Sequence, residues 1–290
     1  MVTSIDIQNN TYKDTKNNDK VRSVTKFDSN TGLILDGNGG TPGFYVYLHK
    51  VNLDSGVITT ITRWDEVVDA SAFYLSKYSM YFFVSYYDWS KNLNIGYNKG
   101  SGNHWKVVLN NIGDSTNSFQ MIELKDQKLV ICSINEGKTT VRCFSGVYSD
   151  PNGSSFPFTL KQTLTDIING ANSYFSMYKL SDDEIIIGYS KNPMKVQRVN
   201  YNLELIGGLL EIGSENEYMD FTMLTQTKLF AIMAKKNTDN TFSYYYTILM
   251  YPHCYSSTIM LKQIDQYNLR RMFTESIAPE LTESTTQIMY

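Results

Sequence analysis

Seven acidic side chains stand in or beside expected turns, and paired carboxylates are the groups with which glycosidases work. Such enzymes need two carboxylates that face each other across a pocket, roughly 5 to 9.5 Å apart. No spacing or motif pairs any two of the seven, so we predict no catalytic residue and no enzyme activity from the sequence. The seven are Asp65, Glu66, Asp69, Asp88, Asp182, Asp183 and Glu184.

The residues that could bind a metal do not form a recognisable motif. His49, His104 and His253 are scattered, and no His/Cys group has zinc spacing. The segment 36–43, DGNGGTPG, begins like a calcium loop, but Tyr47 stands where the twelfth-position acid belongs. We therefore expect a flexible turn over 36–43, no metal site and no cofactor.

The three tryptophans are the candidate ligand-binding residues. Exposed aromatic side chains stack on sugars or anchor protein partners, although aromatics also fill the cores of β-sheet proteins. Trp89 is the strongest candidate for exposure because it lies in the expected turn 88–92, and Trp64 and Trp105 follow it.

Composition narrows the choice of partner. The chain of 290 residues has a net charge of −3 and no basic block, whereas nucleic-acid binding needs clustered Lys and Arg. No apolar run approaches the ~18 residues of a membrane span, and the N-terminus has neither the basic start nor the apolar stretch of a secretory signal. We expect a soluble protein with a protein or glycan partner. Composition does not define its compartment or oligomeric state.

Three cysteines are too few for a disulfide framework. Cys132, Cys143 and Cys254 are expected to be buried thiols, because a free Cys behaves as a small hydrophobic residue. A single bridge is the alternative, since Cys132 and Cys143 could face each other diagonally across one hairpin.

The elements that would position these residues follow a repeat. Bulky apolar residues recur at spacings of five as Phe119, Leu124 and Leu129, and the same spacing returns from Phe73, Phe175 and Met219. The first members are separated by 46, 56 and 44 residues. Repeats of about 40 to 50 residues with four strands each are typical of propeller blades. Helical repeats are excluded, because the segments are β-branched and aromatic and are bounded by Gly, Asn or Asp.

We therefore predict an all-β fold, a β-propeller of four-stranded antiparallel blades, with five or six blades. Residues 1–20 form a polar arm or a closing strand, and 265–290 form a C-terminal extension or part of a closing blade. The propeller covers 21–264, with blades at approximately 21–70, 71–116, 117–171, 172–216 and 217–264.

Two hairpins resemble the Asp-box, the S-x-D-x-G-x-T-W hairpin of sialidase-type propellers. The match departs from the pattern at its acid, because Asp150 is one place early and Pro151 stands where Asp belongs. The matching positions are Ser149, Gly153, Ser155 and Phe156 in one blade and Gly102 and Trp105 in the preceding blade.

The resemblance implies a structural hairpin rather than a catalytic one. A sialidase site would also need three arginines for the substrate carboxylate, a tyrosine nucleophile with a Glu partner, and an acid/base carboxylate. Arg142 and Arg198 fall inside the expected third strands, away from the blade starts. We do not expect sialidase activity.

The function favoured by the sequence is a non-enzymatic binding or assembly module. A propeller is a rigid scaffold whose loops carry the function. A viral or phage structural protein, or a host-attachment protein that binds glycans, suits this weakly charged, polar and aromatic composition. The alternative is a propeller-fold carbohydrate-active hydrolase with loop carboxylates at the central funnel.

Overall fold

The fold was examined in a computed structural model. It describes residues 2–6, 11–14, 20–26, 30–38, 45–52, 54–65, 69–78, 80–87, 91–99, 103–110, 116–135, 140–149, 156–169, 175–189, 194–212, 218–225, 228–239, 241–250 and 262–264, and for part of these only the backbone. Contacts divide the chain into unit 1, Met1–Ser173, and unit 2, Tyr174–Tyr290.

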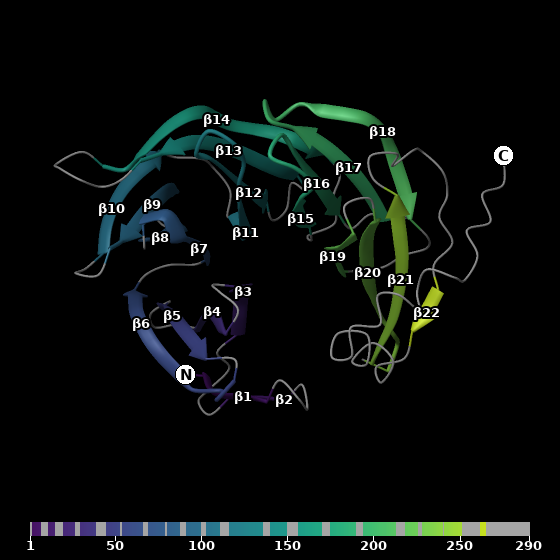
Figure 1. The fold of residues 1–290 in the computed structure, drawn as a ribbon, viewed down its shortest axis with the longest axis horizontal. Helices are drawn as coiled ribbons and strands as arrows, with labels where there is room; N and C mark the ends of the chain where they lie inside the picture. The colour runs from purple at the N-terminus through teal and green to yellow at the C-terminus, as the bar shows by residue number, and fades with distance from the viewer. Residues whose placement is uncertain are drawn as a thin grey trace. The chain divides into compact units, whose positions relative to one another are not determined.

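Unit 1 contains three four-stranded antiparallel sheets and one two-stranded sheet (Figure 1). In each four-stranded sheet, neighbours in sequence are neighbours in space, as in a meander. The strands of the four-stranded sheets are β3 (Lys20–Lys26), β4 (Thr31–Asn38), β5 (Tyr45–Asn52) and β6 (Ile58–Asp65); β7 (Asp69–Leu75), β8 (Met80–Tyr87), β9 (Asn92–Asn98) and β10 (Asn103–Leu109); and β11 (Thr116–Glu123), β12 (Lys128–Asn135), β13 (Thr140–Tyr148) and β14 (Phe158–Asn169). A 3-10 turn, η1 (Ser76–Tyr78), joins β7 to β8.

Unit 2 repeats the same plan in two sheets. Their strands are β15 (Phe175–Lys179), β16 (Glu184–Tyr189), β17 (Met194–Asn200) and β18 (Leu205–Ile212), followed by β19 (Tyr218–Thr225), β20 (Lys228–Lys236), β21 (Phe242–Met250) and β22 (Lys262–Ile264).

The described strands confirm an all-β fold, a five-bladed propeller of small antiparallel sheets. Of the two predicted blade counts, five is the one observed. The residues proposed for a sixth blade do not form one in the described part of the chain: β1 (Val2–Asp6) and β2 (Thr11–Asp14) pair with each other. Residues 265–290 lie outside the described residues. Within the described ranges, no helix has the length and hydropathy needed to cross a bilayer.

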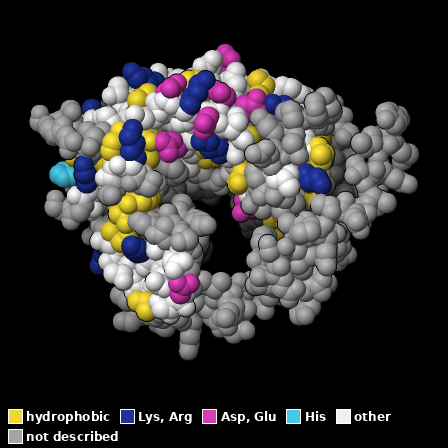
Figure 2. Space-filling view, in the orientation of Figure 1, with side chains coloured by type: hydrophobic (Ala, Val, Ile, Leu, Met, Phe, Trp, Pro, Cys, Tyr) yellow, Lys and Arg dark blue, Asp and Glu magenta, His cyan; other side chains and the backbone are white. Residues whose placement is uncertain are grey.

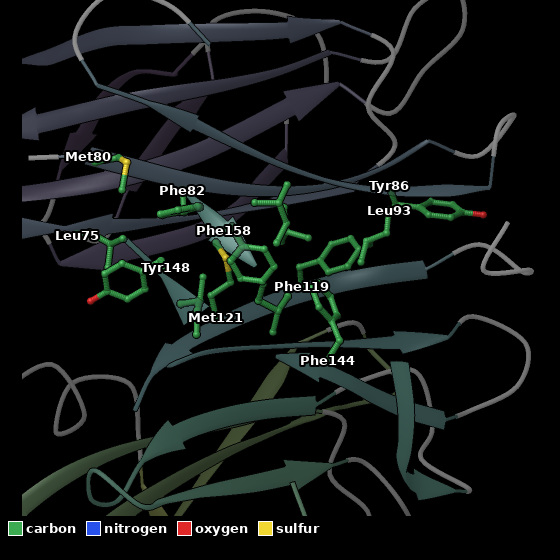
Figure 3. Close-up of a cluster of buried hydrophobic side chains, with 14 residues drawn as sticks. Leu75, Met80, Phe82, Tyr86, Leu93, Phe119, Met121, Phe144, Tyr148 and Phe158 are labelled. Carbon is green, nitrogen blue, oxygen red and sulfur yellow. The ribbon is translucent and has the colours of Figure 1, made fainter. Parts of the chain in front are cut away.

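The second and third blades share one apolar core (Figure 3). Alternate side chains of a strand point to the same face, so Phe82 and Val84 of β8 share one buried cluster with Leu129 and Ile131 of β12. Gly146 of β13 makes room for the Phe158 ring of β14 in the same blade, because a Cβ there would lie 2.1 Å from that ring, and Phe158 in turn lies 6.3 Å from Phe82 of the second blade. The aromatic content of the sequence therefore packs between blades.

The repeated apolar residues lie where the repeat predicts a core. Phe119, Leu124 and Leu129 are buried, with 4%, 2% and 0% of their surface exposed. Phe119 and Leu129 belong to the core shared by the second and third blades. The spacing of five arises because the first residue lies in β11, the second in the turn and the third in β12.

The cysteine interpretation is corrected for two of the three residues. Cys132 and Cys143 are directly opposite each other in the β12–β13 ladder, not diagonal, and they form a disulfide. Both are fully buried. The expectation of free thiols is therefore wrong for this pair, because direct opposition brings the two side chains into bonding range. Cys254 lies outside the described residues.

The expected turn over 36–43 is also corrected. Asp36, Gly37 and Asn38 pair with Tyr47, Val46 and Tyr45 in the β4–β5 ladder. These residues cannot open a calcium loop, because their backbones are engaged in the sheet. Residues 39–43 lie outside the described residues.

In unit 2, a bulge interrupts the last strand of the fourth blade. The β17–β18 register shifts between Val196 and Arg198, and Gly207 has a φ of +72°, a conformation that favours glycine. The buried Gln197 side chain compensates, because its Nε2 donates a hydrogen bond to the Ile206 carbonyl at 3.2 Å. The apolar Leu205 beside the bulge is 51% exposed.

Candidate functional site

The three tryptophans remain a prediction. Trp64 lies in β6 opposite Val46, and Trp105 lies in β10 opposite Gly96. Their side chains and the whole of Trp89 lie outside the described residues.

The acidic residues whose side chains are described stabilise a turn of unit 2. Asp182 forms an ion pair with Lys179 at 2.6 Å. Glu184 Oε2 accepts hydrogen bonds from Arg198 Nη2 at 2.6 Å and Nε at 3.2 Å. The Asp183 backbone N–H donates to Ser181 Oγ. Asp65 and Asp69 are described as backbone only, and Glu66 and Asp88 lie outside the described residues.

The most developed surface feature of unit 1 is a continuous row of rings, which we call the aromatic rim. It comprises one residue from each of six places: η1, β8, β9, β10, the end of β13 and the segment just before β14. Its members are Tyr78, Phe82, Tyr97, His104, Tyr148 and Phe156.

Each ring of the aromatic rim contacts the next. The Tyr78 ring meets Tyr148 edge-on at 5.9 Å between centroids, Phe82 lies 6.1 Å from Tyr148, and Tyr97 lies 6.5 Å from Phe82. Tyr97 then contacts Phe156 edge-on at 5.5 Å. Such pairs stabilise beyond the area they bury, by about 0.5 to 1.5 kcal/mol each. The row is therefore held rigidly between the second and third blades.

Exposure is lowest in the middle of the aromatic rim and highest at His104. Phe82 and Tyr148 are buried, Tyr78, Tyr97 and Phe156 are half-buried, and His104 is exposed. The His104 ring stacks on Tyr97, with centroids 4.8 Å apart and ring planes at 20°. The β9–β10 register explains this pair, because His104 and Tyr97 are direct cross-strand partners.

The buried middle of the aromatic rim carries a tyrosine–carboxylate pair. The Tyr148 hydroxyl, which points away from the other labelled rings in Figure 3, donates a hydrogen bond to Glu123 Oε1. Tyr78 donates to Gln127 Oε1 at 3.3 Å. The turn that supplies Gln127 is fixed by Tyr148, whose backbone N–H donates to the Gln127 carbonyl at 3.1 Å.

A tyrosine paired with a glutamate is also the arrangement of a tyrosine nucleophile, but Tyr148 lacks the properties that a nucleophile needs. Burial, with the hydrogen bond to Glu123, raises the pKa of Tyr148 well above its ordinary value. A nucleophile needs the opposite shift and an accessible oxygen, and Tyr148 is only 2% exposed. Sequence reasoning missed the pair, because its members are 25 residues apart and share no local motif.

Two lysines lie over rings of the aromatic rim. Lys106 Nζ is 5.9 Å from the Phe156 ring centroid, and Lys77 Nζ is 5.1 Å from that of Tyr78. Both side chains are exposed. His104 and Lys106 are two residues apart on β10 and so share one face of the strand. Lys and Arg side chains adjoin hydrophobic ones in Figure 2, over the part of the molecule where Figure 1 places β10.

The Asp-box-like hairpin contributes structurally to the aromatic rim. The Ser149 backbone N–H donates to the Pro157 carbonyl at 2.8 Å, which closes the base of the hairpin. Phe156, at the aromatic position of the motif, is thereby placed against Tyr97 of the preceding blade. The other matched positions, Gly153 and Ser155, lie outside the described residues. Among the described residues, no group of three or more His, Cys, Asp or Glu could hold a metal ion.

Comparison with known proteins identifies no family. No protein-family model and no curated protein matches the chain. Similar solved structures include a GH43 β-1,3-galactosidase (TM-score 0.49, 10% identity, 87% of this chain), oligopeptidase B from Trypanosoma brucei (0.46, 12%, 85%) and a Hadza microbial sialidase (0.44, 9%, 70%). The chain spans 60%, 33% and 47% of the lengths of those proteins. At these identities and scores, the likeness says nothing about substrate or activity.

Proposed function

We propose that this propeller binds carbohydrate and that the aromatic rim of unit 1 is its binding surface. The observation that carries the proposal is the exposed end of the rim, where His104 stacks on Tyr97 and Phe156 meets the same tyrosine edge-on. Ring faces held in fixed positions offer apolar area to the C–H faces of a sugar at little cost in side-chain entropy.

Polar groups beside these rings suit a hydroxylated ligand. His104 and Lys106 supply nitrogen atoms on one strand face, and Lys106 lies over the Phe156 ring. Sites of this kind combine an apolar platform with a few polar groups that fix ligand orientation. The rings are held by the core beneath them, so the platform is preorganised and loses little freedom on binding.

The test is glycan binding by the full chain, first on an array and then by titration calorimetry with the best ligand. Phe156→Ala is expected to weaken binding by roughly three- to tenfold, because one ring contact is worth about 0.5 to 1.5 kcal/mol. Tyr201→Ala is the matched control, since Tyr201 is a half-buried aromatic in a turn of unit 2. Equal weakening by both variants, or binding to no glycan, would contradict the proposal.

Hydrolysis of the same ligands is the second candidate function. It is favoured by Glu123, a half-buried carboxylate at the aromatic rim, and by Asp126, an exposed carboxylate three residues later in the same region of the chain. Two carboxylates are the minimum for general glycosidase chemistry. The best array ligand is incubated with wild type, Glu123→Gln and Asp126→Asn, and products are followed by chromatography. Turnover lost in both variants would establish a hydrolase, and intact ligand with wild type would leave a binding protein.

A further inference from the structure

The exposed polar side chains described at the aromatic rim are all basic residues. The two lysines that lie over its rings, Lys77 and Lys106, are both exposed, and the ring at the exposed end is His104. All three lie in the segment 76–109. This segment contains two further lysines, Lys91 and Lys99, and a single acidic residue, Asp88. This segment is therefore locally positive in a chain whose net charge is −3.

A carboxylate that contacts the aromatic rim, Glu123, already has a partner within the protein. Glu123 accepts the hydrogen bond of Tyr148, and both residues are withdrawn from full exposure. The exposed charged groups beside the rim are two ammonium groups, each with three donors and no acceptor. A hydrogen bond from an ammonium group to an anion is stronger than one to a neutral hydroxyl, so the lysines favour an anionic ligand.

We infer that the ligand of the aromatic rim is an acidic oligosaccharide, with sulfate or carboxylate groups that the lysines bind; this inference rests on the proposed carbohydrate binding. Lys77 and Lys106 stand at opposite ends of a chain of five ring residues: Tyr78, Tyr148, Phe82, Tyr97 and Phe156. A ligand that reaches both lysines therefore has several sugar units. The anionic groups contact Lys77 and Lys106. A sugar face lies on the exposed end of the rim at His104, Tyr97 and Phe156, whereas Phe82 and Tyr148 are buried.

A single-stranded nucleic acid is also an anion that stacks on aromatic side chains. The sequence opposes it, because the negative net charge and the absence of a basic block give no electrostatic footprint for a polyphosphate. An oligonucleotide is therefore included in the test as a competing ligand, not as the proposal.

The experiment uses four probes on the full chain by titration calorimetry: a heparin hexasaccharide (sulfate), hexagalacturonate (carboxylate), cellohexaose (neutral) and a twelve-nucleotide single strand of thymidines. We expect at least one acidic hexasaccharide to bind more than tenfold tighter than cellohexaose, with affinity that falls as salt rises. The stronger of the two acidic probes identifies the anionic group.

Three charge variants locate the binding. Lys106→Gln and Lys77→Gln are each expected to weaken the acidic probe by about two- to fivefold, the range of an exposed ion pair. Lys161→Gln is the matched control, because Lys161 is an exposed lysine of β14 outside the aromatic rim. The affinity of the Lys161→Gln variant for the acidic probe is expected to equal that of wild type. Thermal melting of each variant confirms that the fold is intact.

The outcomes separate the inference from the proposed function. If cellohexaose binds as tightly as the acidic probes, the inference is overturned and carbohydrate binding stands. If none of the hexasaccharides binds and the array is empty, the proposed function itself is wrong. Tighter binding of the oligonucleotide, or equal loss with Lys161→Gln, would also overturn the inference.

Discussion

The two units build the same interface between blades from different side chains. In unit 1 the second and third blades pack rings against rings, with Phe82, Tyr86 and Phe144 among them. In unit 2 the fourth and fifth blades pack mainly aliphatic side chains, such as Ile186, Leu210 and Leu229. Among the described buried residues of that core Phe221 is the one ring, and the partly buried Tyr178 and Tyr245 pack against it. The strand plan is common to both, so the choice of rings is not required by the propeller fold.

The two units also differ in what their charged side chains contact. In unit 2 the described basic side chains of the fourth blade pair with neighbouring acids: Lys179 with Asp182, Lys195 with Glu211 and Arg198 with Glu184. In unit 1, Arg142 likewise pairs with Asp166, but Lys77 and Lys106 lie over aromatic rings. The comparison indicates that the fourth blade uses these charges to hold its own strands and turn, whereas the second blade presents charge and rings together.

The largest expected effect comes from a charge in the shared core of unit 1. Leu129→Asp should unfold the protein, because a buried carboxylate without a partner costs several kcal/mol. Leu205→Asp in unit 2 is the control, since its side chain is 51% exposed and should tolerate the charge. Circular dichroism and thermal melting measure both. A folded Leu129→Asp protein of normal stability would count heavily against the propeller.

Removal of the disulfide should have the next largest effect. Cys132 and Cys143 are 11 residues apart, and a closed loop of that size restricts the unfolded chain by about 3 kcal/mol. The double variant Cys132→Ala, Cys143→Ala should lose that much in a denaturant titration under oxidising conditions. Under reducing conditions, wild type and variant should converge. Two free thiols in the purified wild type, found by thiol labelling in denaturant, would refute the bridge.

Two glycine substitutions compare packing in the two units: Gly146 packs on a ring of its own third blade, and Gly188 of the fourth blade packs on side chains of the fifth. A Cβ on Gly146 would meet the rigid Phe158 ring at 2.1 Å, whereas a Cβ on Gly188 would first meet the flexible Met219 Sδ at 2.5 Å and then the Phe221 ring. Gly146→Ala should cost about 2 to 3 kcal/mol and Gly188→Ala about 1 to 2 kcal/mol. Chemical denaturation of the two variants gives the order. The reverse order would show that the Gly188 site, between the fourth and fifth blades, is the more tightly packed of the two.

The smallest expected effect concerns the buried tyrosine of the aromatic rim. The pKa of Tyr148 is raised in the folded protein, so the stability from its protonated form is complete below the unfolded pKa of ~10 and is lost as pH rises beyond it. Tyr148→Phe should cost about 1.5 kcal/mol at neutral pH and reduce the decline of Tm above pH 10. Identical pH profiles for variant and wild type would indicate that Tyr148 does not limit stability at high pH.

The propeller fold could be predicted from the sequence, because the repeated spacing of apolar residues marks core positions that recur from blade to blade. Phe119, Leu124 and Leu129 mark the core through spacing alone. It was insufficient for local exceptions. Asp36 and Gly37 are residue types that favour turns, yet pairing with Tyr47 and Val46, respectively, keeps them in a strand. Ladder register decides such cases, and composition does not encode register.

The candidate site was less predictable, because its contacts join residues that are distant in sequence, either between blades or across one blade. Tyr78 and Gln127 are 49 residues apart, and Tyr148 and Glu123 are 25 apart. No spacing within one segment reveals such pairs. The tryptophans singled out from the sequence stay predictions, whereas Phe156, noticed only as part of an imperfect Asp-box, turned out to contact both Tyr97 and Lys106.

The bulge at Gly207 affects whether molecules of this protein can associate through the edge strand β18. Strand β18 is the last in its sheet, and its segment 205–210, LIGGLL, has no charge to discourage a second chain from adding to it. A regular strand of this composition would be a template for growing β-aggregates. Gly207 breaks the regular ladder and turns one carbonyl inward to Gln197. The irregularity thus serves colloidal stability: a straightened β18 should make concentrated solutions precipitate.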